Sequence, residues 1–354
     1  MSHRHLVSGP QHIILHHMPA VMAGLGLVLG AVMLISVGVG AVAIPIDTVW
    51  GVIQSKLLPG SIEGDWSAGR ENIVWEVRAP RIILGALVGA SLAIVGAALQ
   101  SVTRNPLADP HLLGVSAGAA FGAILALLHV GMVLGPLTLP VFAFAGALGA
   151  TALVLMAANL TRAQSADRLI LAGVAVGFII TALGNLFIFL GDPRATHTVI
   201  FWMLGGLGLA SWDQLIFPLL ALGVGSAYLI VRARAFNAMI LGDESATAMG
   251  IPARRFRLAV FIVCALLTGC AVAFSGVIGF VGLMIPHIVR LVVGGDYRRV
   301  LPLSAIGGAL FLVLTDMAAR SLMPPQDMPL GILTGLIGGG AFIVLMRRRA
   351  GAGS

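Results

Sequence analysis

Hydrophobic residues fall in ten long runs along the chain, separated by short polar stretches. Each run is close to the roughly 20 residues that a helix needs to cross a bilayer. A further run, Val199 to Leu209, is too short to span and rich in glycine, and such a segment is tolerated at membrane depth only where protein or a cavity surrounds it. The pattern predicts an all-α fold, a polytopic membrane bundle of about ten transmembrane helices with one partial or re-entrant helix. The ten runs are 18–43, 79–102, 110–130, 136–160, 168–190, 211–232, 257–275, 277–294, 300–322 and 329–346.

The polar stretch Ile44 to Val77 is the longest connection, and it carries apolar residues at helical spacing. This pattern is typical of a short amphipathic helix that lies on the membrane surface. The apolar positions are Ile46, Val49, Trp50, Ile53 and Leu57. Residues 1–17 are polar and rich in histidine. We interpret them as a tail, with metal binding as the alternative.

Composition agrees with the pattern. Hydrophobic residues make up 58% of the 354 residues, charged residues only 10%, and the mean hydropathy is +1.03. A soluble domain is nearer to a quarter charged, so we expect a single transmembrane domain over residues 1–354. The net charge of +7 does not indicate nucleic-acid binding, because the arginines are scattered between apolar runs. Cys264 and Cys270 lie in one run and indicate neither a disulfide framework nor a metal site.

Basic residues indicate the orientation. With the N-terminus inside, fifteen of the 21 lysines and arginines face the cytoplasm, which is the distribution that membrane proteins prefer. We therefore expect both termini in the cytoplasm and residues 44–77 outside. The six basic residues placed outside are Lys56, Arg70, Arg78, Arg81, Arg194 and Arg320.

Small residues recur at every fourth position in three runs. This spacing lets helix backbones approach closely, so we expect tight packing within the bundle. For the last set, contact with a second subunit is an alternative. The sets are Gly85, Gly89, Ala93 and Ala97; Gly114, Gly118 and Gly122; and Gly331, Gly335 and Gly339.

Two polar connections carry helix-boundary signals. Between the second and third runs, Asp109 followed by Pro110 predicts an N-cap and the start of a helix. Residues 241–257, LGDESATAMGIPARRFR, form a polar island in which Gly242 and Asp243 predict a break and an N-cap. A helix of about six residues is expected from there, too short to be stable alone. Gly250 is then the stop, and Pro252 begins a second short helix. The island is either a linker between membrane halves or a docking element for a cytoplasmic partner.

No motif for ATP hydrolysis is present. The single lysine, Lys56, follows Ser55 where a phosphate-binding loop requires glycine. A chain of intramembrane carboxylates, which a proton relay would need, is also missing. If the protein is an active pump, we expect ATP and Mg²⁺ to be bound by a partner ATPase, with no cofactor or metal on this chain.

Several long motifs resemble the permease subunits of type II ABC importers for siderophores, haem and cobalamin. The similarity covers nearly the whole chain, in order, with Met328 as a mild departure where an acidic-Leu-Pro pattern often carries Leu. The motifs are RAPR at 78–81, GASLAIVGAALQSVTRNPLADPHLLGVSAGAAFGA at 89–123, the island at 241–257, GVIGFVGLMIPHIVRLVVGGDYRRVLP at 276–302 and DMPLGILTGLIGG at 327–339.

The resemblance implies an assembly and a location. It implies a homodimer in the bacterial inner membrane, two cytoplasmic ATPase subunits and a periplasmic substrate-binding protein. The resemblance also implies that the island seats in a groove of the ATPase through Gly242, Asp243, Glu244, Ala246, Met249, Gly250, Ile251 and Pro252.

Three outer arginines match positions that contact the binding protein in this family: Arg78, Arg81 and Arg320. Arg78 and Arg81 stand three apart at a helix start, where cations are disfavoured by the helix dipole. The alternative is that they lie at the membrane interface with their charges in water. Asp316 and Arg320 are four apart and can pair along one helix.

The resemblance also places the fifth run, residues 199–209 and the tenth run along the transport pathway. These segments are nearly free of charge, which suits a bulky, partly apolar solute and not a bare ion, because an ion needs oxygen or charged ligands in place of its water. We favour haem, with a siderophore–iron chelate or cobalamin as alternatives. From another class, an ion-coupled secondary transporter would share the broken helices but requires ion ligands. The candidate pathway residues are Phe178, Phe201, Met203, Gly205 and Gly335.

Overall fold

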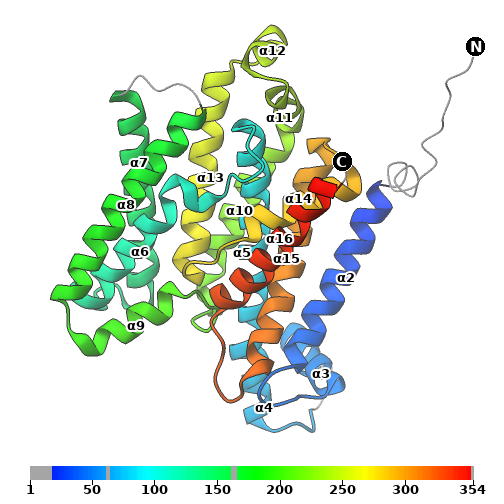
Figure 1. Ribbon diagram of the computed structural model, residues 1–354. Helices are drawn as coiled ribbons and strands as arrows, with labels where there is room; N and C mark the ends of the chain where they lie inside the picture. Colours follow the sequence, from blue (N-terminus) through cyan, green and yellow to red (C-terminus); the bar gives the residue numbers. More distant parts are fainter. Residues whose placement is uncertain (1–17, 61–63, 161–165, 352–354) are drawn as a thin grey trace, which may run out of the picture.

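The computed structural model describes residues 18–60, 64–160 and 166–351, and all regular structure in this part of the chain is helical (Figure 1). Seven of the described helical segments are long and apolar enough to cross a membrane. Three shorter apolar helices, Val115–Val130, Val281–Val293 and Leu330–Ile343, fall within the remaining predicted runs. The predicted all-α membrane bundle is confirmed, and the count of about ten agrees with these segments.

The helices follow the chain from α2 to α16. The first half contains α2 Met18–Gly38, α3 Ile46–Leu57, α4 Ala68–Asn72, α5 Ala79–Val102, α6 Val115–Leu125, α7 Thr138–Leu160, α8 Ala166–Leu190 and α9 Pro193–Met203. The second half contains α10 Ile216–Val231, α11 Ala233–Ile240, α12 Asp243–Ala248, α13 Ala253–Ser275, α14 Val281–Val293, α15 Tyr297–Leu322 and α16 Leu330–Gly351.

Helix α5 forms the centre of the bundle. Almost all of its side chains are buried, and it packs against α13, α14 and α15. Glycine makes this packing possible: a Cβ atom on Gly89 would overlap the carbonyl of Gly308 on α15, and one on Gly96 would overlap the carbonyl of Gly282 on α14. Lipid tails are as apolar as the helix surfaces, so the hydrophobic effect does not bring helices together within a membrane. Close backbone contacts of this kind stabilise the packing instead. The predicted tight packing of the small-residue repeat in α5 is confirmed.

The pair α6 and α7 packs in the same way. Gly118 lies against Gly146, and Gly122 lies against the backbone of Phe142. The two helices cover one side of the bundle together with α8. The second predicted set of small residues therefore also serves helix packing.

The two ends of the bundle differ in their elements. Helices α11 and α12 lie at one end, together with the start of α2 and the end of α16 (Figure 1). Helices α3, α4 and α9 lie at the opposite end (Figure 1). We call these the α12 end and the α3 end. The described chain thus begins and finishes at the same end, as an even number of spans requires.

The predicted surface helix in residues 44–77 is α3, but it buries part of its apolar face. Val49 and Val52 are fully buried in a cluster with α2 and the segment after α4, whereas Trp50 remains exposed. The span that follows begins earlier than predicted. Helix α4 and a π-helical segment, Ile73–Arg78, run directly into α5, so the helix extends about three turns before residue 79.

The predicted partial helix corresponds to α9, but its predicted bounds were wrong. The prediction placed it at Val199 to Leu209, but the helix covers Pro193–Met203, and residues 204–211 are not helical. Asp192 caps this helix through the Arg194 amide, with Pro193 in its first turn. Tertiary contacts explain the early end, because residues after Met203 hydrogen-bond to other segments instead of continuing the helix.

Candidate functional sites

The first candidate site is the polar turn, which we define as residues 241–252. Helix α12 has the predicted six residues, and Gly250 ends it with a φ of +82°. The amides of Gly250 and Ile251 close the helix on the carbonyls of Thr247 and Ala246, at 2.9 Å each. The predicted short helix and its glycine stop are confirmed.

Two details of the polar turn differ from the prediction. Gly242, with a φ of +111°, occupies the position before the helix, so Asp243 lies inside the first turn and is not the cap. Pro252 does precede a helix, but that helix is the long span α13 and not a second short one. The second short helix is α11, which comes before the polar turn. Its apolar spacing, with Phe236 and Met239 buried three residues apart, could have revealed it.

An ion pair holds the polar turn against the bundle. Asp243 accepts a hydrogen bond from Nη2 of Arg257 at 2.6 Å, while Nε of Arg257 donates to the carbonyl of Val102 at 3.1 Å. Arg104 approaches the same carboxylate at 3.9 Å. The hydrogen bond from Arg257 lowers the pKa of Asp243 below its usual range. The carboxylate is therefore charged at neutral pH, and it links α12 to the end of α5.

A second polar link supports α11. The side-chain amide of Asn237 donates to Asp296 at 2.8 Å, and the amide of Tyr297 donates to the Asn237 oxygen at 2.8 Å. Hydrogen bonds from Arg298 are the main cause of a strongly lowered pKa at Asp296, which caps α15. Hydrogen bonds to charged groups therefore hold both short helices, α11 and α12, against the bundle.

The polar turn leaves apolar side chains exposed at the tip of the molecule. Leu241 is 67% exposed, Met249 is 54% exposed, and Ile240, which precedes Leu241 in the chain, is 43% exposed. We call these three residues the apolar tip. Among the other predicted coupling residues, Glu244, Gly250 and Pro252 are exposed and Ile251 is half-buried. Ala246 is fully buried, so it supports the turn and does not contribute to its surface.

The second candidate site is the arginine cluster at the α3 end, formed by Arg78, Arg81, Asp316 and Arg320. All four side chains are buried. Arg81 and Arg320 each contact Asp316 at 2.9 Å, so one carboxylate bridges α5 and α15. Arg81 also pairs with the half-exposed Asp327. The predicted pairing of Asp316 with Arg320 is confirmed, and Arg81 joins it from a distant part of the sequence.

The remaining donors of the arginine cluster bind the end of α2. Arg78 donates to the carbonyls of Val37 at 2.8 Å and Gly38 at 3.1 Å. Arg320 donates to the carbonyl and hydroxyl of Ser36, at 2.9 and 2.8 Å. The last carbonyls of a helix lack partners within it, and arginine is well suited to satisfy them. The three arginines that the sequence suggested for docking are thus occupied within this chain, and their contact with a binding protein stays a prediction.

The third candidate site is a glycine junction, where three segments meet through their backbones. It joins the segment after α9, the link between α13 and α14, and the start of α16. Gly206 donates to Ser275 at 2.8 Å, Leu330 donates to Gly205 at 2.9 Å and Gly331 donates to Leu204 at 2.9 Å.

At three glycines of the junction, no side chain larger than hydrogen fits. A Cβ atom on Gly205 or Gly331 would collide with a backbone carbonyl, and Gly205 has a φ of +74°. Gly276, with a φ of +65°, lies against the carbonyl of Trp202. Non-helical backbone at membrane depth requires such internal partners. Gly205 therefore joins packed segments and does not leave open space along the predicted transport pathway.

The other predicted pathway residues fall into two groups. Phe178 on α8 is 74% exposed and Phe201 on α9 is 53% exposed, and a Cβ atom on Gly335 would meet open space. Met203 is half-buried and packs against the core. The exposed members belong to α8, α9 and α16, three helices that this single chain leaves partly uncovered.

Comparison with known proteins identifies the class. The model of the FecCD transport family matches residues 28–348, and the chain belongs to this family. It is a membrane-spanning permease of the ABC-transporter type.

Three relatives illustrate the family. The uncharacterized ABC transporter permease YvrB of Bacillus subtilis is 41% identical over 91% of this chain and 92% of its own. The hemin transport system permease HmuU of Yersinia pestis is 35% identical over 94% of this chain and 96% of its own. The cobalamin import system permease BtuC of Halobacterium salinarum is 42% identical over 78% of this chain and 74% of its own.

A solved structure shows the same fold. A metal-chelate type ABC transporter in an inward-facing conformation superposes with a TM-score of 0.81 at 31% identity, covering 93% of this chain and 99% of that one. The similarity therefore extends over the complete helical bundle.

Proposed function

We propose that this chain is the transmembrane permease of an ATP-driven importer that carries haem or a related iron chelate into the cytoplasm. The observation that supports this most directly is the family match over residues 28–348, together with relatives named for hemin and cobalamin transport. Both cargoes are bulky metal chelates built on a macrocycle. The pathway helices proposed here carry exposed phenylalanines and open glycines, which suit such a cargo.

The α12 end is proposed to face the cytoplasm and to bind the ATPase. The arginine distribution along the sequence supports this orientation. The apolar tip exposes apolar side chains beside the short helix α12, and the ion pair between Asp243 and Arg257 fixes the position of this helix. A partner groove that covers the tip would complete its packing, and movement of the ATPase would reach α5 through Arg257 and Val102.

The permease is proposed to work as a homodimer with the pathway on its axis. Helix α16 carries Leu336, which is 71% exposed, one residue after the open Gly335. Helix α8 exposes Phe178 and Phe189. A second copy would bring two such faces together around the cargo, with the glycine junction of each copy beside them.

Helix α9 offers a set of side chains that fits haem. Arg194, His197 and Phe201 are exposed and stand at positions i, i+3 and i+7, on one face of the helix. The rings of His197 and Phe201 lie 5.0 Å apart. An arginine suits the haem propionates, an imidazole can ligate the iron, and a phenyl ring contacts the flat macrocycle. This face lies at the α3 end, where cargo would enter (Figure 1).

Reconstitution tests both the transport reaction and the cargo. The permease, its ATPase and its binding protein are placed in liposomes, and uptake of haem, cobalamin and a ferric siderophore is measured with and without ATP. We expect ATP-dependent haem uptake that is reduced at least tenfold by His197→Ala. His129→Ala, at another exposed histidine, is the matched control and should retain uptake.

The alternatives predict different results. Uptake of cobalamin or a siderophore in place of haem would reject haem as the cargo, but it would still support the proposal that the chain belongs to an ATP-driven importer. Uptake driven by an ion gradient, with no need for ATP or an ATPase, would support a secondary transporter and reject the importer.

A further inference from the structure

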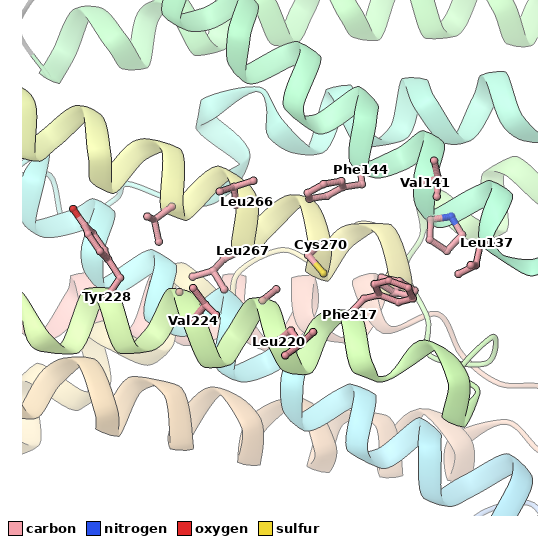
Figure 2. A pocket seen from close by; sticks show the side chains of 15 residues that line it. Leu137, Val141, Phe144, Phe217, Leu220, Val224, Tyr228, Leu266, Leu267 and Cys270 are labelled. Carbon is pink, nitrogen blue, oxygen red and sulfur yellow. The ribbon is translucent and has the colours of Figure 1, made fainter.

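An apolar groove runs along the outside of the bundle between α7, α10 and α13 (Figure 2). Its volume is about 660 Å³. Val141 and Phe144 line it from α7, Leu220 and Val224 from α10, and Leu266 and Cys270 from α13 (Figure 2). The groove involves neither α8 nor α16, the helices proposed to face a second copy. It is therefore available to the surrounding membrane in the assembly proposed above.

The length of the groove matches one leaflet. Its lining on α10 extends from Phe217 to Tyr228, which at about 1.5 Å per residue corresponds to roughly 16 Å. Half of a typical hydrocarbon core is about 15 Å. One extended acyl chain that starts at the α12 end of α10 therefore fits along the groove and reaches past the middle of the span.

The groove has a polar end. Tyr228 supplies the one hydroxyl group among its described lining residues. The guanidinium of Arg232 lies 5.3 Å from the centre of the Tyr228 ring, where the helix α10 has just ended. Arg232 and Arg234 are exposed, and neither forms an ion pair with a carboxylate of the described residues. The opposite end, at Leu137 and Phe217, carries only apolar side chains.

We infer that this groove is a binding site for an anionic phospholipid, with one acyl chain between α7, α10 and α13 and the phosphate on Arg232. The apolar walls and the cationic end match the two parts of such a lipid. The tyrosine ring holds the guanidinium beside the opening, and its hydroxyl can donate to a phosphate oxygen. The site belongs to the leaflet at the α12 end, which is the cytoplasmic leaflet in the orientation proposed above.

The acyl chain would also affect packing between helices. Gly225 on α10 lies so close to Leu267 on α13 that an added Cβ atom would be 2.7 Å from the leucine side chain. The two helices thus meet tightly at one point and separate along the groove. A bound chain fills the space beside this contact, so we expect it to stabilise the arrangement of α10 against α13.

The test uses the full-length permease, purified in mild detergent and delipidated. Phosphatidylglycerol and phosphatidylcholine of the same acyl composition are added, and bound lipid is counted by native mass spectrometry while the melting temperature is followed. We expect one phosphatidylglycerol per chain and a higher melting temperature than with phosphatidylcholine. Arg232→Gln should weaken phosphatidylglycerol retention by roughly tenfold, the size of one charge-assisted hydrogen bond.

Two pairs of variants separate the site from general lipid effects. Val224→Trp fills the groove and should abolish retention, whereas Leu219→Trp, exposed on the same helix outside the groove, should not. Arg254→Gln removes an exposed cation at the same end and should leave retention unchanged. Equal retention of the two lipids, or equal loss in Val224→Trp and Leu219→Trp, would overturn the proposal. A protein in place of lipid at this groove in the purified complex would also overturn it.

Discussion

The two ends of this permease use charge in opposite ways. At the α3 end, the arginine cluster is buried, and its charged groups bind each other and the last carbonyls of α2. At the α12 end, the ion pair between Asp243 and Arg257 lies beneath a turn that leaves Leu241 and Met249 exposed. The charged groups of the α3 end are therefore paired within the chain, whereas the α12 end leaves apolar side chains exposed.

This difference teaches which residues can meet a partner without a change in the permease itself. The apolar tip can be covered by an ATPase while the bonds beneath it remain. The arginine cluster can meet acidic groups of a binding protein only by exchanging existing partners, because its guanidinium groups already bind Asp316 and α2.

The largest effect is expected at Asp316. Asp316→Asn removes the carboxylate shared by Arg81 and Arg320 and leaves two buried cations without it. Breaking a buried ion pair from one side costs about 3–5 kcal/mol. We expect loss of folded protein, measured as the monodisperse peak in size-exclusion chromatography and as the melting temperature.

Asp327→Asn provides the matched control, because Asp327 pairs with the same Arg81 but is half-exposed. Water can replace this partner, so the cost should be about 1 kcal/mol or less. If the two variants are equally stable, the arginine cluster is not the closed structural site described above.

The second prediction concerns the apolar tip. Met249→Glu places a charge on a side chain that is exposed in the free chain and covered in the proposed complex. An exposed substitution changes stability by about 0.5 kcal/mol or less, whereas loss of a well-packed residue at the centre of an interface costs about 2 kcal/mol or more of binding free energy. We expect a normal melting temperature and ATPase binding at least fivefold weaker, measured by pull-down or surface plasmon resonance. Leu57→Glu, at an exposed leucine of the α3 end, should leave ATPase binding unchanged.

The hydrophobic pattern was sufficient to predict most of the fold. Apolar runs near 20 residues located the spans, and Gly250 located the end of α12, because these features depend on neighbours within the sequence. The same reasoning paired Asp316 with Arg320, four positions apart. It could not pair Arg81 with Asp316, because 235 positions separate them and only the packing of α5 on α15 brings them together.

The start of α9 does carry a signal in the sequence. Asp192 and Pro193 begin α9 with the same cap-and-proline pair that Asp109 and Pro110 provide in the turn between α5 and α6. This pair therefore marks the start of α9 in the sequence. The end of α9 was not predictable in this way, because the glycine junction determines it through hydrogen bonds to Ser275 and Leu330, which lie on distant segments.

The third prediction tests the backbone of the polar turn. Gly250 has a φ of +82°, and no atom would lie within 4 Å of an added Cβ. Gly250→Val therefore introduces backbone strain without a collision, at a cost of about 1–3 kcal/mol. We expect weaker ATPase coupling with normal membrane insertion, measured as ATP-driven uptake in liposomes. Gly250→Asn should recover most of the coupling, because asparagine tolerates the left-handed conformation. Equal loss in both variants would show that the conformation at Gly250 is not the cause.

The smallest effect is expected from the ion pair beneath the polar turn. The pKa of Asp243 is lower in the folded protein than in the unfolded chain, where it is about 3.9. The carboxylate therefore contributes stability that is fully present at neutral pH and is lost as the pH falls below about 4, through the lowered pKa. The melting temperature of the wild type should exceed that of Asp243→Asn at pH 7, and the difference should shrink as the pH falls. Asp296, whose pKa is also lowered, is present in both proteins, so its titration cancels in this difference. The side chain of Asp243 is 42% exposed, which keeps the effect small. A difference that stays constant with pH would mean that Asp243 acts through its shape and not through its charge, and the contrast between the two ends would then rest on the apolar tip alone.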